Sequence, residues 1–285
     1  MKIATVELDG EAVAGVVRDG GLAHLRAHFD DAVALLVAAS RSEERERLDE
    51  LIAAAPTIDL ADCRFLPPVT RPRRILCVGT NYATHVAESD RVTDRPDHPM
   101  IFTRFPSSLV GHELAIVRPP ESTAFDYEGE LAIVIGRPTR RVTRHEAIAA
   151  IGGYSCFMDG TLRDWQRHTS QFTPGKNFDS SGSWGPWIVT GDEIDDPHDL
   201  RLTTTVDGNV VQDASTSQLI FDLADIIVHC SHFTTLEPGD VIATGTPGGV
   251  GYARDPQIWL EPGTEVKVEV AGVGELVNPV VQEAA

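Results

Sequence analysis

The sequence has no paired cysteines, no long apolar run and almost no lysine. No apolar stretch reaches the roughly 18 residues that a membrane-spanning helix needs, and the N-terminal MKIATVELDG lacks the apolar core of a secretory signal. The four cysteines lie far apart and form no CxxC pair, which fits reduced thiols better than disulfides or a zinc cluster. We therefore expect a cytoplasmic protein that does not enter a membrane.

Acidic residues outnumber basic ones by 43 to 24, which gives a formal net charge of −19. This charge disfavours nucleic acid and anionic membranes as partners. An acidic protein that binds an acidic ligand needs a local positive centre, which a bound cation would supply. Lys176 is the only lysine between Lys2 and Lys267, and its isolation among arginines suggests a role that arginine cannot take.

Residues 1–70 are predicted to form a small α+β domain. Short alternating strands surround two Asp-Gly turn pairs, and two short helices follow. The second helix shows a capping pattern, with Ser40 followed by Glu43 three residues later. A proline-rich break over residues 67–72 then marks a domain boundary.

Residues 71–285 are predicted to form a larger, β-rich mixed α/β domain. The expected elements are strands over 74–79, 131–136, 240–245 and 265–270, a hairpin around 207–208, and helices over 143–150 and 217–233.

The segment FDYEGELAIVIG places Glu128 and Glu130 two residues apart, so on a strand both side chains point to one face. A solvated strand face would carry such a pair, but the apolar residues that follow predict a strand buried on both sides. Two buried like charges need a compensating cation, and carboxylate oxygens favour Mg²⁺ or Mn²⁺. Asp159, after the run GYSCFM, would be a third ligand, although an Asp-Gly turn also explains it. The pair His229 and His232 has no third soft ligand nearby and is interpreted as structural.

Three further motifs carry groups suited to proton transfer or ligand binding. In GTNYATHVAE, the spacing of His85 and Glu88 lets the carboxylate orient the imidazole as a general base, although a surface pair on a helix has the same spacing. Lys176 occupies a turn-rich stretch that would present its ammonium group to a ligand. In ATGTPGGVG, the backbone amides and the Thr246 hydroxyl would suit a carboxylate.

The order and spacing of these motifs resemble the fumarylacetoacetate hydrolase family over roughly residues 72–280. The resemblance rests on GTNYATHVAE, FDYEGELAIVIG, YSCFMDGTLRDWQ, GKNFDSSGSWGP and LEPGDVIATGTPGGVG. It implies the family's β-roll, a variable N-terminal domain and a homodimer.

The resemblance also implies roles for individual residues. Glu128, Glu130 and Asp159 would bind one Mg²⁺ or Mn²⁺ ion per subunit, and His85 with Glu88 would activate water. The other residues implied are Lys176 in catalysis and Tyr82, Arg163, Gln166 and Thr246 in substrate binding.

These implications predict an enzyme that hydrolyses a C–C bond in a small 2-oxo or β-diketo acid, such as an acylpyruvate, in aromatic or sugar-acid catabolism. Family members share the stabilisation of an enolate, so a decarboxylase or isomerase of oxaloacetate-like or 2-hydroxymuconate-type acids is the alternative. The intact acidic and basic positions disfavour a non-catalytic ligand-binding protein. The polar residues 84–98 lack an apolar stripe and are predicted to form a mobile lid.

Overall fold

Most strands join one long mixed sheet in this computed structural model, which describes residues 1–88 and 96–284. The order across the sheet is β4 (Thr57–Asp59), β3 (Gly21–His24), β2 (Glu11–Arg18), β1 (Lys2–Leu8), β14 (Gly182–Thr190), β12 (Ile151–Met158), β11 (Gly129–Ile135), β17 (Val241–Ala243), β6 (Ile75–Gly79) and β7 (Met100–Thr103). Two short strands join at its sides, β5 (Arg64–Leu66) beside β1 and β8 (Leu109–Val110) beside β14.

The N-terminal strands form the two predicted hairpins. Asp9 and Asp19 occupy the left-handed region at φ 55° and 50°, each followed by a glycine at φ 79°, as tight hairpin turns require. Strand β1 then pairs antiparallel with β14, where Lys2 faces Val189. The N-terminal sheet therefore continues into the rest of the chain, and the domain division at residue 70 stays a prediction.

The predicted N-terminal cap of the second helix is wrong. The two helices form, as α1 (Ala32–Ala39) and α2 (Arg45–Ala54), but Ser40 is the C-terminal cap of α1. Its hydroxyl donates to the Leu36 carbonyl oxygen, so it cannot hold the start of α2, which follows a short 3-10 turn.

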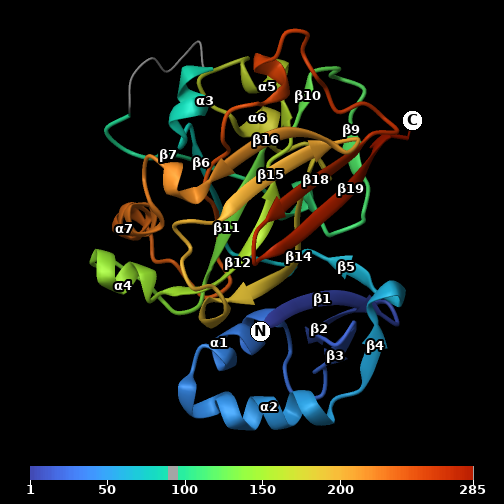
Figure 1. Ribbon diagram of the computed structural model, residues 1–285, viewed down its shortest axis with the longest axis vertical. Coiled ribbons are helices and arrows are strands. Elements are labelled where there is room, and N and C mark those ends of the chain that lie inside the picture. Colours follow the sequence, from blue (N-terminus) through green and yellow to red (C-terminus); the bar gives the residue numbers. More distant parts are fainter. Residues whose placement is uncertain (89–95, 285) are drawn as a thin grey trace.

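A second, five-stranded sheet crosses in front of β11 and β12 (Figure 1). Its order is β16 (Asn209–Ser215), β15 (Arg201–Val206), β18 (Glu265–Val270), β19 (Gly274–Gln282) and β9 (Ile116–Arg118). Apolar side chains of both sheets, such as Ile133 and Val268, form one buried core. Gly129 permits the close approach, since a Cβ there would lie 2.0 Å from Thr204 Oγ1. The predicted β-rich mixed α/β fold is confirmed.

The remaining elements are small. They are the pair β10 (Phe125–Asp126) and β13 (Thr161–Leu162), the helices α3 (Ala83–Ala87), α4 (Arg144–Ile148), α5 (Arg163–Gln166), α6 (Thr173–Lys176) and α7 (Leu223–Phe233), and 3-10 turns at Ser42–Glu44, Leu60–Asp62, Pro106–Ser108, Gly191–Glu193, Thr216–Gln218 and Gly251–Ala253. In the described chain no helix has the length and apolarity that a membrane crossing requires.

The helix predicted over residues 217–233 begins later, at Leu223, with Asp222 as its N-cap. Asn81 explains the delay, because it binds the preceding segment. Its carbonyl oxygen accepts from the Ile220 amide at 2.7 Å and its Oδ1 accepts from the Phe221 amide at 2.8 Å. These contacts hold the segment before α7 in a non-helical path beside α3.

Helices α3, α5 and α6 gather at the end of the molecule that lies away from the N-terminal hairpins (Figure 1). Strand β11 starts beneath them, and β12 ends there, because the two strands are antiparallel and Gly129 faces Met158. This pairing brings the Glu128–Glu130 segment and Asp159 to the same place.

Candidate active site

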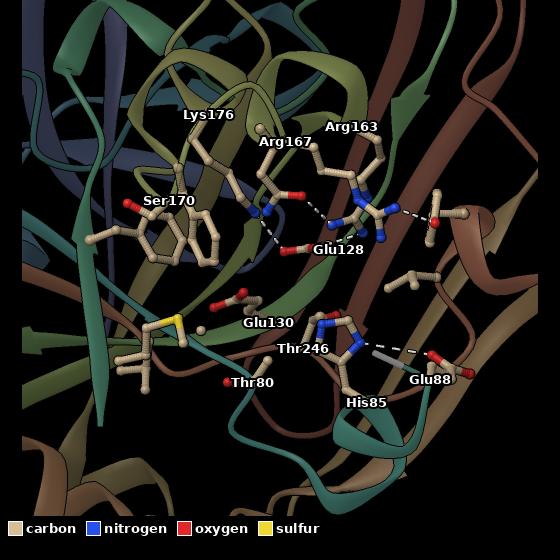
Figure 2. Close-up of a pocket in the computed structure, with 18 residues that line it drawn as sticks. Thr80, His85, Glu88, Glu128, Glu130, Arg163, Arg167, Ser170, Lys176 and Thr246 are labelled. Atoms are coloured by element: carbon tan, nitrogen blue, oxygen red, sulfur yellow. Dashed lines mark hydrogen bonds and ion pairs between the residues drawn. The ribbon is translucent and has the colours of Figure 1, made fainter. Parts of the chain in front are cut away.

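A cavity of about 270 Å³ lies among α3, α5, α6 and the start of β11 (Figure 2). Apolar side chains of β6, β7 and the segment before α6 form part of its wall, among them Val78, Phe102 and Phe172. Eight of the predicted site residues line it: His85, Glu88, Glu128, Glu130, Arg163, Gln166, Lys176 and Thr246. Residues 89–95, the middle of the predicted lid over 84–98, lie outside the described residues.

Three carboxylates meet at the floor of this cavity. Glu128, Glu130 and Asp159 each offer an oxygen, and these oxygens all lie within 4.8 Å of one another. All three residues are buried. The Asp159 amide donates to the Glu128 carbonyl oxygen at 2.8 Å, which fixes the end of β12 against the start of β11.

Cations surround two of these carboxylates. The Lys176 Nζ lies 2.6 Å from Glu128 Oε2 and 2.7 Å from Asp159 Oδ2. Arg163 Nη2 lies 2.7 Å from Glu128 Oε1, and the buried Arg104 places Nη1 2.5 Å from Asp159 Oδ1. Burial alone would raise the pKa of Glu128, but Lys176 and Arg163 outweigh it and lower that pKa to about 2.

Glu130 has a different environment. Among the described contacts its Oε2 accepts a hydrogen bond from the Gly245 amide at 2.7 Å, and no ion pair reaches it. Burial, followed by the charges of Asp159 and Glu128, raises its pKa well above the usual range. A divalent cation among the three carboxylates would offset the cost of burying Glu130 as an anion beside Asp159 and Glu128. Oxygen ligands suit Mg²⁺ and Mn²⁺. The donor set therefore fits such an ion.

The glycine-rich loop 244–251 binds carboxylates of the protein itself. The amides of Gly245, Gly249 and Gly251 donate to Glu130, Glu88 and Asp126, at 2.7, 2.8 and 2.8 Å. Gly249 stands at φ 99°, and a Cβ there would lie 2.2 Å from a neighbouring carbonyl oxygen, so the loop needs glycine at that position. The carboxylates that the loop holds here are internal, so its predicted binding of a ligand carboxylate stays a prediction.

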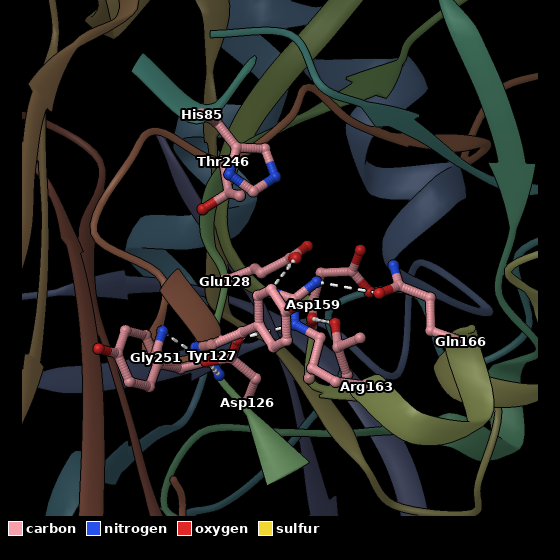
Figure 3. Close-up of polar contacts among 12 residues, drawn as sticks. His85, Asp126, Tyr127, Glu128, Asp159, Arg163, Gln166, Thr246 and Gly251 are labelled. Atoms are coloured by element: carbon pink, nitrogen blue, oxygen red, sulfur yellow. Dashed lines mark hydrogen bonds and ion pairs between the residues drawn. The ribbon is translucent and has the colours of Figure 1, made fainter. Parts of the chain in front are cut away.

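Asp126 links this loop to α5 (Figure 3). Its Oδ2 lies 2.7 Å from Arg163 Nε, while its Oδ1 accepts the Gly251 amide. Arg163 also donates through Nη1 to Gln166 Oε1 at 3.1 Å. Arg163 is thus held on three sides, by Asp126, Glu128 and Gln166.

The predicted pair of His85 and Glu88 forms on α3 and its C-cap, but loosely. His85 Nδ1 and Glu88 Oε2 are 3.8 Å apart, longer than a hydrogen bond, and neither atom has a hydrogen-bond partner among the described residues. The two side chains are 14% and 30% exposed, whereas the carboxylates below them are buried. Glu88 is anchored through its other oxygen, to the Gly249 amide.

Two of the predicted substrate-binding residues are placed differently from expectation. The Thr246 hydroxyl lines the cavity but donates to the Gly129 carbonyl oxygen at 2.9 Å and accepts from Gln212 Nε2 at 2.8 Å. Tyr82 is fully buried and is not among the residues lining the cavity. Burial, followed by the charge of Glu130, raises the pKa of its hydroxyl.

Several residues of the site had no signal in the sequence. Arg104, Asp126 and Gln212 reach Asp159, Arg163 and Thr246 across 55, 37 and 34 residues, so no local spacing reveals these contacts. Thr80 lines the cavity in the left-handed region at φ 51°, which is unusual for a β-branched residue. His229 stacks on His98 at 6.1 Å, and within the described chain it joins no metal-binding group.

Comparison with known proteins gives matches over most of the chain. A family model described as fumarylacetoacetate (FAA) hydrolase C-terminal matches residues 74–281. The chain is 42% identical over 233 residues to the mitochondrial oxaloacetate tautomerase Fahd2a of Rattus norvegicus, covering 81% of this chain and 74% of that protein. Because that relative is mitochondrial by name, a cytoplasmic location stays a prediction for this chain.

Solved structures also match the chain over its length, among them two hydrolases. The fumarylacetoacetate hydrolase of Exiguobacterium antarcticum is 37% identical with a TM-score of 0.87, covering 99% of this chain and 100% of the other. The maleylpyruvate hydrolase of Sphingobium sp. SYK-6, solved with manganese(II) and pyruvate, is 29% identical with a TM-score of 0.82 and full coverage of both chains.

Proposed function

The chain belongs to the fumarylacetoacetate hydrolase family, and we propose that it is a metal-dependent enzyme that interconverts the keto and enol forms of oxaloacetate or a similar small 2-oxo diacid. One observation carries the proposal. Three buried carboxylates with an uncompensated Glu130 lie at the floor of a small cavity whose wall includes a histidine.

Glu128, Glu130 and Asp159 are the proposed ligands of one Mg²⁺ or Mn²⁺ ion. Such an ion would supply the positive charge that stabilises an enolate as it develops. The maleylpyruvate hydrolase structure, which contains manganese(II) and pyruvate, supports this choice of ion and of ligand class.

The protein's own groups bind the substrate and move a proton. Lys176 and Arg163 bring positive charge to the cavity wall, and their carboxylate partners fix where that charge lies. His85 removes a proton from the carbon next to the 2-oxo group, and the proton is returned to the oxygen to give the enol. Glu88 orients the imidazole. Because His85 and Glu88 are not locked together by a hydrogen bond, the imidazole can shift between the carbon and the oxygen.

Tautomerisation is placed ahead of the predicted hydrolysis on two grounds. The rat relative is an oxaloacetate tautomerase and is 42% identical. The cavity, at about 270 Å³, lies just below the roughly 300–1,000 Å³ typical of small-molecule sites, which suits a four-carbon acid. Hydrolysis of an acylpyruvate is the second candidate, because both solved relatives are hydrolases that match the chain over its whole length.

The test is a comparison of three reactions with the purified protein. Oxaloacetate tautomer interconversion is followed by the ultraviolet absorbance of the enol, acetylpyruvate hydrolysis by the same absorbance, and oxaloacetate decarboxylation by pyruvate release. Each assay is run with Mg²⁺ and with EDTA. We expect tautomerisation to show the highest kcat/KM and to require the ion. Faster acetylpyruvate hydrolysis would favour the second candidate, and no ion-dependent reaction with either acid would refute both.

A further inference from the structure

Resting on the proposed function, we infer that Arg167 selects dicarboxylic over monocarboxylic 2-oxo acids by binding the carboxylate at the far end of the substrate. Arg167 lines the cavity and directly follows α5. Its guanidinium lies over the ring of Tyr252, which also lines the cavity.

The first argument is the balance of charge in the cavity. The buried cluster at its floor consists of Asp126, Glu128, Glu130, Asp159, Arg104, Arg163 and Lys176. Four carboxylates against three cations leave one negative charge, which a divalent ion turns into one positive charge. One positive charge balances the negative charge of a single substrate carboxylate. Among the described lining residues outside this cluster, Arg167 is the one arginine or lysine, and Glu88, which accepts the Gly249 amide, is the one carboxylate; Arg167 therefore places a guanidinium at the cavity wall where a second substrate carboxylate can bind.

The second argument is position. Arg167 follows Arg163 by four residues across a helical turn, so their side chains share one face with about 5–6 Å between Cβ atoms. Arg163 contacts the proposed metal ligand Glu128, and Arg167, one helical turn further along the chain, contacts Tyr252 instead. That step is similar to the distance between the two ends of a four-carbon diacid. Figure 2 shows Arg167, Arg163 and Lys176 along one side of the pocket, with His85 across from them.

The third argument is that Arg167 is held in place before a ligand arrives. Its guanidinium carbon lies 3.7 Å from the centroid of the Tyr252 ring, and its Nη1 donates to the Tyr252 hydroxyl. A guanidinium stacked on an aromatic face keeps its N–H groups in a defined plane, which suits the planar carboxylate. Ordering the arginine then costs little on binding.

Asp126 fixes the spacing between the two arginines. One of its oxygens, Oδ2, accepts the Tyr252 amide at 3.0 Å and pairs with Arg163 Nε at 2.7 Å. The Asp126 carboxylate thus fixes the positions of both Arg163 and Tyr252, on whose ring Arg167 stacks. The separation between Arg163 and Arg167 then selects the length of the diacid that binds.

Equilibrium binding tests this role without depending on turnover. Calorimetric titration in Mg²⁺ compares malate with 2-hydroxybutanoate, unreactive four-carbon analogues of 2-oxo acids that differ in the distal carboxylate. The proteins are the wild type, Arg167→Met, Arg167→Lys and Arg201→Met, the last removing an exposed arginine that does not line the cavity. We expect the wild type to bind the diacid at least tenfold more tightly.

Arg167→Met is expected to weaken diacid binding about ten- to hundredfold, as the loss of a charge-assisted hydrogen bond does, and to change monoacid binding less than threefold. Arg167→Lys is expected to recover part of the preference, and Arg201→Met to keep all of it. Equal weakening of both acids in Arg167→Met, an unchanged preference, or a wild type that binds neither acid or both equally would overturn the inference. If the preference holds and depends on Arg167 but oxaloacetate is not turned over, the proposed function fails and the inference stands.

Discussion

The floor and the mouth of the cavity are built in opposite ways. At the floor, Glu128 and Asp159 share Lys176 through contacts of 2.6 and 2.7 Å, and every one of these groups is buried. At the mouth, His85 and Glu88 are partly exposed and 3.8 Å apart, with one polar atom of each lacking a partner in the described chain. The floor holds fixed charges, and the mouth holds a histidine that no hydrogen bond joins to Glu88.

This difference separates two demands of the proposed reaction. Stabilising an enolate requires charges that are already in place, since reorganising them during the reaction would raise the barrier. Moving a proton between a carbon and an oxygen requires a base that can reach both. Changes at the floor should therefore damage stability and activity together, and changes at the mouth should damage activity alone.

The largest effect is expected from Lys176→Met. It leaves Glu128 and Asp159 buried without their shared cation, so the free energy of unfolding should fall by about 3–5 kcal/mol, and activity should fall at least about 10³-fold. Chemical denaturation and steady-state kinetics measure the two losses. Lys267→Met is the control, because Lys267 forms only longer pairs with partly exposed acidic residues and should change stability by less than about 1 kcal/mol. Full activity in Lys176→Met would contradict the role of the floor.

His85→Ala should lower activity without lowering stability. Loss of a general base typically lowers the rate about 10²–10⁴-fold, while the free energy of unfolding should change by no more than about 0.5 kcal/mol. His145→Ala, on the exposed side of α4, serves as the matched histidine control. A normal rate with the preferred substrate would show that His85 does not carry the proton.

The pH dependence of ion binding tests the floor in another way. In the metal-free protein the pKa of Glu130 is raised above its ordinary value of 4.5. Between 4.5 and that raised pKa the native state holds more protons than the unfolded chain, so stability falls as pH rises through this window. Below 4.5 both states are protonated and the effect vanishes. Mg²⁺ displaces the proton, so its affinity should rise up to about tenfold per pH unit in the window, and Glu130→Gln should abolish that slope. Calorimetry at several pH values measures it, and a slope of zero in the wild type would contradict the assignment.

Glu88→Gln is expected to have the smallest effect. It keeps an oxygen for the Gly249 amide and removes only the charge that orients His85, so the rate should fall by about three- to tenfold, less than in His85→Ala. A loss as large as that of His85→Ala would mean that Glu88 itself handles the proton.

The sequence predicted the floor well, because a strand with apolar faces on both sides shows where its two glutamates must lie. Glu128, Glu130 and Asp159 come together through the ordinary pairing of two adjacent antiparallel strands. The tight Asp-Gly turns and the strands β6, β11, β17 and β18 were also readable, since each depends on residues a few positions apart.

The features that the sequence did not predict depend on distant contacts. Arg104 reaches Asp159 only once the fold is complete, and Asn81 delays the start of α7 from 140 residues away. The β-roll itself came from the resemblance and not from periodicity. The homodimer, the lid and the hydrolysis of an acylpyruvate stay predictions.

The most direct test of the account is the formation of an enolate from pyruvate, independent of which reaction follows. Proton NMR in D₂O follows the exchange of the pyruvate methyl protons for deuterium in the presence of the protein. We predict exchange well above the uncatalysed rate with Mg²⁺ or Mn²⁺, abolished by EDTA and by Lys176→Met and strongly slowed in His85→Ala. Exchange at the background rate in the wild type with saturating ion and pyruvate would contradict the central claim.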